Sequence, residues 1–197
     1  MLLLGSKLLN YPVLSLQIGG ELGITATPII DPVKLKIIAY QLSGPLVDRE
    51  PANTLMTDDV RELSPMGLII DSVDDLVDPN DVIRVKQIID YDFHLINHKV
   101  ITKKKQNIGR VADYTIDSAT FSIYQLVVKR PFLSSLNDPE LTINRSQIIE
   151  IDDDKVIIKN DTQTVKLDPV QLASSSSYIN PFRKTETPKP VESSDTE

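Results

Sequence analysis

Residues 22–45 read LGITATPIIDPVKLKIIAYQLSGP, and residues 108–131 read IGRVADYTIDSATFSIYQLVVKRP. Both stretches carry an apolar-Gly step, an Ile-Asp turn, an apolar strand and a proline, and Asp31 and Asp117 stand 86 positions apart. A recurrence in constant register indicates an internal repeat, which sets the architecture before any strand is assigned. The same spacing relates Leu35 to Phe121, Ile37 to Ile123, Tyr40 to Leu126, Pro45 to Pro131, Leu9 to Leu95 and Leu14 to Val100.

Beyond Pro45 the spacing becomes 88 residues, which an insertion of two residues in a loop explains. It relates Val60 to Ile148, Glu62 to Glu150, Leu63 to Ile151, and residues 68–70 to residues 156–158. We therefore predict a first repeat over residues 1–77 and a second over residues 94–173.

Each repeat contains short apolar runs separated by Gly, Pro, Asp and Asn, a pattern typical of β-hairpins. The expected strands are 12–17, 22–30, 35–42 and 68–70 in the first repeat, and 99–102, 109–116, 120–128 and 155–159 in the second. A small hairpin-rich sheet has to hide its edges, and closure does so. The sequence thus predicts a mostly β fold with two tandem small barrels.

A short helix is expected to join the repeats over residues 78–93. Asp78-Pro79-Asn80-Asp81 resembles a helix start, and Val82, Val85, Ile88 and Ile89 recur at helical spacing.

Residues 174–197 are dominated by Ser, Thr, Pro and charge, and this composition predicts a disordered tail. The tail holds one apolar island, Tyr178, Ile179 and Phe182. Such an island can dock to a partner or fold back onto its own domain, and both interpretations stay open.

The composition narrows the classes of function. A hydrophobic content of 41% allows a normal core, whereas the net charge of −7 disfavours generic nucleic-acid binding. The absence of cysteine removes disulfides, thiolate metal sites and Cys nucleophiles. We find no signal peptide and no apolar run long enough to cross a bilayer, so a cytoplasmic protein without membrane insertion is expected.

Three groups of residues resemble reactive sites but suit structural roles better. His94 and His98 have the spacing of two helical zinc ligands but lack a third ligand. Asp152-Asp153-Asp154 lacks the alternating ligands and glycine of a calcium loop and suits a hairpin turn. Asp31 and Asp117 stand at turns, where Asp bonds its own backbone. The sequence therefore predicts no catalytic residue, no metal and no cofactor.

Two surfaces are candidates for contact with a partner. The strand before each proline is apolar on both faces, but only one face can line the interior of a small barrel. The side chains of the other, outer face are therefore expected to pack between the repeats or against a partner. That set is Ile38, Tyr40, Leu42, Tyr124, Leu126 and Val128. A basic edge is formed by Lys99, Lys103, Lys104, Lys105 and Arg110, which RNA could touch.

The order of an opening β-segment, an apolar-Gly step, an apolar-Asp turn, an apolar strand and a closing apolar pair resembles the PRC-barrel domain family. The resemblance covers residues 3–77 and, more clearly, 94–168. Its clearest residues are Ile108-Gly109-Arg110-Val111, Ile116-Asp117 and Val156-Ile157-Ile158.

The family includes the cytoplasmic domain of the photosynthetic reaction-centre H subunit and the C-terminal domain of a bacterial ribosome maturation factor. The resemblance implies a non-enzymatic barrel used as a protein-binding adaptor, whose partner and oligomeric state the sequence leaves open. The alternative is a ribosome-assembly or RNA-processing factor that binds a ribonucleoprotein through the second repeat.

Overall fold

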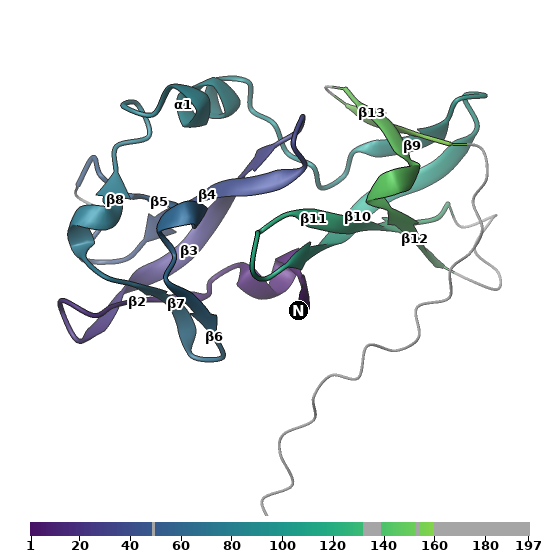
Figure 1. The fold of residues 1–197 in the computed structure, drawn as a ribbon. Helices are drawn as coiled ribbons and strands as arrows, with labels where there is room; N and C mark the ends of the chain where they lie inside the picture. The colour runs from purple at the N-terminus through teal and green to yellow at the C-terminus, as the bar shows by residue number, and fades with distance from the viewer. Residues whose placement is uncertain (49, 132–138, 153, 160–197) are drawn as a thin grey trace, which may run out of the picture. The chain divides into compact units, whose positions relative to one another are not determined.

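The computed structural model describes residues 1–159 apart from 49, 132–138 and 153 (Figure 1). This part of the chain is mostly β, as predicted, with two sheets and one α-helix. Within it, no helix is long and apolar enough to cross a membrane. The expected tail over residues 174–197, with Tyr178, Ile179 and Phe182, lies outside the described residues.

The first sheet has the strand order β6-β7-β2-β3-β4-β5-β8. Its strands are β2 (Pro12–Ser15), β3 (Gly20–Asp31), β4 (Lys36–Ser43), β5 (Thr54–Met56), β6 (Glu62–Ser64), β7 (Gly67–Ile70) and β8 (Leu76–Val77). Strands β2 and β7 run parallel, and the other neighbours are antiparallel.

The second sheet has the order β12-β11-β10-β9-β14-β13, and β1 adds to the free edge of β10. Its strands are β1 (Leu2–Leu4), β9 (Lys99–Thr102), β10 (Asn107–Asp117), β11 (Ile123–Lys129), β12 (Glu140–Asn144), β13 (Ile148–Ile151) and β14 (Lys155–Ile158). Its one parallel pair, β9 and β14, occupies the place of β2 and β7. Neither sheet closes into a barrel among the described residues, so the expected closure is not shown.

The two long hairpins share one hydrogen-bonding register. Strands β3 and β4 pair Thr25 with Leu42, Pro28 with Tyr40 and Ile30 with Ile37. Strands β10 and β11 pair the residues 86 positions later, and both hairpins have register shifts at the same two places. The strands that follow the hairpins correspond at a spacing of 88 residues, because Tyr40 pairs with Leu55 and Leu126 pairs with Ile143. The spacing inferred from sequence therefore describes the backbone pairing.

The opening strand departs from the expected register by one residue. The buried residues Leu8 and Val13 correspond to Leu95 and Val100, a spacing of 87, while Leu9 is 42% exposed. The predicted pairs Leu9 with Leu95 and Leu14 with Val100 are wrong. In both repeats an asparagine with positive φ, Asn10 or Asn97, precedes the strand and fixes this register.

The turns of the two hairpins bond to each other. Ile37 N donates to Phe121 O at 3.0 Å, and Ile123 N donates to Leu35 O at 2.8 Å. These four residues form two pairs of repeat equivalents, so the bonds are related by the same symmetry as the repeats. Leu35 and Phe121 have φ values of 47° and 54°, a conformation that is costly for bulky residues and persists only where the surroundings fix it.

Each repeat is covered by a segment that leads into the strands of the other repeat. Strand β1, at the start of the first repeat, pairs with Thr115–Asp117 of β10. Gly5 follows β1 and packs so closely on the Tyr114 ring that an added Cβ would lie 2.2 Å from it. Helix α1 (Ile83–Asp90), which precedes the second repeat, packs against β3 of the first.

The expected linker helix is present but starts later than its apparent start signal. Asp78 Oδ1 accepts from Asn80 N at 2.8 Å, which forms a turn before the helix instead of a cap on it. Of the four residues at helical spacing, Val85 and Ile88 are buried, Val82 is half-buried and Ile89 is exposed.

An ion pair holds α1 to the first repeat. Arg84 Nη2 lies 2.9 Å from Asp31 Oδ1 and Arg84 Nε lies 3.1 Å from Oδ2, while the Asp31 side chain is 1% exposed. Asp31 also accepts from the amides of Val33 and Lys34, as expected for a turn. Burial by itself raises the pKa of Asp31, but the bond from Arg84 and the two amides together lower that pKa below its usual value.

Of the two roles predicted for the outer face of the strands before the prolines, contact with a partner is wrong for four of the six residues. Tyr40, Leu42, Leu126 and Val128 are buried, whereas Ile38 is half-buried and Tyr124 is 47% exposed. A register shift at Ile38 and Tyr124 is the physical reason, because an extra residue reverses which side chains face inward. The buried four cannot bind another molecule. Tyr40 does contact the other repeat, with its ring 6.5 Å from that of Phe121.

We expect the Asp31 ion pair to stabilise the fold in a pH-dependent way. Folding lowers the pKa of Asp31, so the ionised carboxylate stabilises the folded state. This stabilisation is fully present above the unfolded carboxyl pKa of about 4, and it is lost as pH falls through the lower pKa of the folded state. In urea unfolding at pH 7, Asp31→Asn should cost about 1 to 2 kcal/mol and show a smaller loss of stability toward pH 3. The matched control is Asp71→Asn, which breaks an exposed pair with Arg61 and should cost clearly less than Asp31→Asn. Equal costs would contradict the assignment.

The corrected alternation also makes a prediction. Leu126→Ala should destabilise by about 2 to 5 kcal/mol, because it empties a fully buried site. Tyr124→Ser, two residues away, should change stability by less than about 0.5 kcal/mol. Thermal melts of the two variants measure the difference, and similar losses would mean that Tyr124 is part of the core.

Candidate functional site

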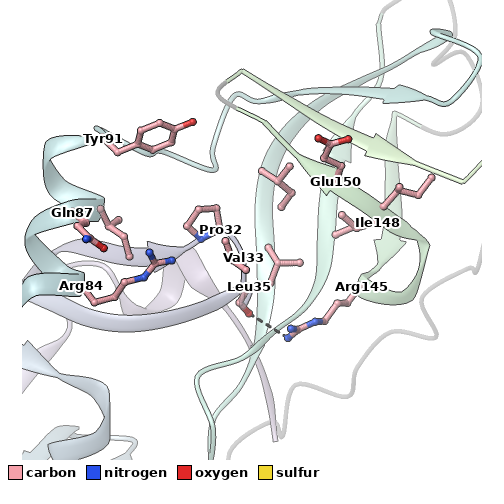
Figure 2. A pocket seen from close by; sticks show the side chains of 12 residues that line it. Pro32, Val33, Leu35, Arg84, Gln87, Tyr91, Arg145, Ile148 and Glu150 are labelled. Carbon is pink, nitrogen blue, oxygen red and sulfur yellow. Dashed lines mark hydrogen bonds between the residues drawn. The ribbon is translucent and has the colours of Figure 1, made fainter.

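A groove of about 690 Å³ lies beside helix α1 and strand β13, and it is our candidate site (Figure 2). Figure 2 shows Tyr91, Gln87 and Arg84 on the helix side and Ile148 and Glu150 on the opposite wall. The full lining is Pro32, Val33, Leu35, Arg84, Gln87, Ile88, Tyr91, Arg145, Ile148, Ile149, Glu150 and Ile151. Both repeats and the linker helix contribute to it.

Apolar side chains in the groove are open to solvent. Val33 is 83% exposed, Tyr91 54% and Ile149 41%. Single exposed apolar residues are ordinary, but several around one hollow mark a contact surface. Each stands on a different element: the β3–β4 turn, the end of α1, and β13.

The two arginines of the lining already have partners. Arg84 binds Asp31, as described above. Arg145, from the second repeat, donates to the carbonyls of Lys34 and Leu35 in the turn of the first repeat, at 3.4 Å for Leu35. Both arginines therefore hold the β3–β4 turn to the neighbouring walls of the groove. Apolar contact is the main interaction that the groove offers a ligand.

Strand β13 gives the groove a second means of binding. Among the described residues it pairs only with β14, so its other edge has no strand beside it. Its register shifts between Ile148 and Glu150, a bulge of the kind that commonly protects sheet edges. An extended segment can still add to such an edge through backbone hydrogen bonds.

The candidate reactive residues are held apart. His94 is exposed, with Nδ1 2.9 Å from Asp92 O, whereas His98 is 7% exposed and packs on Phe93. Asp152 and Asp154 flank the β13–β14 turn, where both lie near Lys155, and Asp153 is outside the described residues. In the described part of the chain, no three His, Cys, Asp or Glu side chains gather as metal ligands.

The predicted basic edge divides into two parts. Lys99 and Arg110 are direct cross-strand partners on β9 and β10. Lys103, Lys104 and Lys105 lie in the turn between these strands, and all five side chains are exposed.

Sequence reasoning missed the groove. Its residues come from three separate segments, and their only signal was apolar side chains at places where a turn or strand end is usually polar. Val33 in the β3–β4 turn is the clearest case, since it is exposed and apolar beside Asp31 and Pro32.

In comparisons with known proteins, no family model and no curated protein matches the chain. The candidate site therefore has to be interpreted from its own geometry.

Proposed function

We propose that the chain is a non-enzymatic adaptor, built from two PRC-barrel-like repeats, that binds an extended segment of another protein in the groove. The observation that supports this most directly is the placing of exposed Val33, Tyr91 and Ile149 around a hollow next to β13, whose second edge pairs with no described strand. The common register of the two hairpins supports the tandem arrangement.

An extended peptide suits both features of the groove. It would form backbone hydrogen bonds with β13, and every second side chain would then point the same way, toward the apolar lining. Tyr91 is the first expected anchor, because tyrosine is enriched among the few residues that supply most binding energy, and Ile149 adds apolar area that becomes buried. Glu150, exposed on the rim, favours a basic residue beside the partner's apolar positions.

The affinity expected from such a site can be estimated. Burying one large apolar side chain contributes about 1.5 to 3 kcal/mol, and 1.4 kcal/mol corresponds to a factor of ten in Kd. Ile149→Lys should therefore weaken partner binding about 10-fold or more, measured by calorimetry with the purified partner. Met66→Lys is the matched control, because Met66 is 70% exposed in the first repeat and away from the groove. Equal weakening by both variants would contradict the site.

The identity of the occupant is tested by photocrosslinking in the full chain. A photoreactive phenylalanine analogue at Tyr91 should form an adduct with one other protein, and Ile149→Lys should abolish it. An adduct with residues 174–197 of the same chain would make the tail the occupant, and an adduct with a second copy would make the groove a self-association site. Either result would overturn the proposal of a separate partner.

A further inference from the structure

A row of four cations crosses the second sheet. Lys155 is the register partner of Lys99, Lys99 of Arg110, and Arg110 of Lys129, on the adjacent strands β14, β9, β10 and β11. We call these four residues the cation row. Neighbouring strands lie about 4.8 Å apart, so the charges are close enough to repel one another.

The row lies on the solvent face of the sheet. Val100, Val111, Val128 and Val156, each next to a member of the row along its strand, are fully buried. Because successive side chains of a strand point to opposite faces, the cations point outward. Lys99, Arg110 and Lys129 are exposed.

The repulsion between the four cations destabilises the sheet, and in the described structure an ion pair reduces it only at Lys155. Like charges directly opposite each other destabilise a sheet. Lys155 is paired with Asp152 at 2.7 Å, but Lys99, Arg110 and Lys129 form no ion pair with a described residue. Arg110 Nη1 instead donates to Asn97 O at 2.8 Å, and Glu140 stands opposite Lys129 without an ion pair in the described structure.

The first repeat shows that the fold does not need these charges. At the positions equivalent to Lys155, Lys99, Arg110 and Lys129 it has Gly67, Pro12, Ile24 and Ser43, in the same strand register. The charge therefore belongs to the second repeat alone.

The centre of the row borders a hollow of about 550 Å³. Its lining includes Lys99, Arg110, Lys129 and Arg130 with the amides Asn97 and Asn107, and none of the described residues in it is a carboxylate. Four cations around one hollow, in a chain whose net charge is −7, form a local site for an anion.

We propose that the cation row and Arg130 bind the phosphate backbone of single-stranded RNA. A repeated anion matches a repeated cation, and a flexible single strand can enter a hollow that a rigid duplex cannot follow. Among the described residues the lining holds no aromatic side chain, so phosphates are the expected contact. Asn97 and Asn107 can bond the 2′-hydroxyl, which DNA lacks. Lys103, Lys104 and Lys105 extend the positive charge along the same hairpin.

This site is separate from the groove, so the adaptor function and RNA binding can succeed or fail independently. The probe is a labelled oligouridylate, and binding to the full chain is followed by fluorescence anisotropy over a salt series. Neutralising three to four phosphates predicts a slope of about 2 to 3 in log Kd against log salt.

Charge reversal supplies the decisive comparison. Lys99→Glu with Lys129→Glu should weaken oligouridylate binding about 10-fold or more and lower the salt slope by about 1 to 2. The double variant alternates the charges over β14, β9, β10 and β11 but sets a carboxylate opposite Glu140, so its melting temperature should change little. Lys7→Glu with Lys86→Glu makes the same change in net charge at exposed lysines elsewhere and should leave Kd within about two-fold.

Binding and competition measurements can overturn the proposal in several ways. These are no binding of the oligouridylate, equal weakening by the control pair, equal affinity for oligothymidylate, and equal affinity for poly-glutamate. The last two would reassign the row to DNA or to an acidic protein segment. Inorganic phosphate that competes at concentrations near the Kd of the oligouridylate would reduce the site to one for single anions.

Discussion

The two hydrogen bonds between Ile37 N and Phe121 O and between Ile123 N and Leu35 O are the contact on which the rest of the arrangement depends. They join equivalent points of the two repeats, and they hold two bulky residues, Leu35 and Phe121, at positive φ. Each such residue costs about 1 to 3 kcal/mol, which the joined turns have to offset. Arg145 adds two donors to the carbonyls of the same turn, so the wall of the groove is fixed at the point where the repeats meet.

Much of the pairing follows from the sequence, because Gly, Asp and Pro mark the turns at a constant spacing. The pairs 86 and 88 residues apart that were inferred after Leu22 describe the observed register. The register predicted for the opening strands was wrong because Leu8 and Leu9 are equally apolar. Only the backbone turn at Asn10 decides which of the two is buried.

The face of the strand before each proline could not be predicted for a different reason. The four residues 37–40 are all apolar or amphipathic, so their hydropathy pattern cannot reveal where the bulge lies. The register shift turns Tyr40 inward, although its hydroxyl has no hydrogen-bond partner in the described structure, and burial raises the pKa of Tyr40. The groove was missed because it depends on how distant segments meet.

Internal symmetry helps to separate what the fold requires from what it does not. Where both repeats keep a feature, as with the joined turns and the shared bulges, the feature belongs to their common fold. Where they differ at equivalent solvent-facing positions, as with Ile24 and Arg110 or Ser43 and Lys129, the sheet accepts either residue. Three adjacent cations without an ion pair to any described residue are unfavourable for stability, and the first repeat folds without them. The charges of the second repeat therefore have to be explained by something outside the sheet, and a bound anion is the simplest source of the compensating charge.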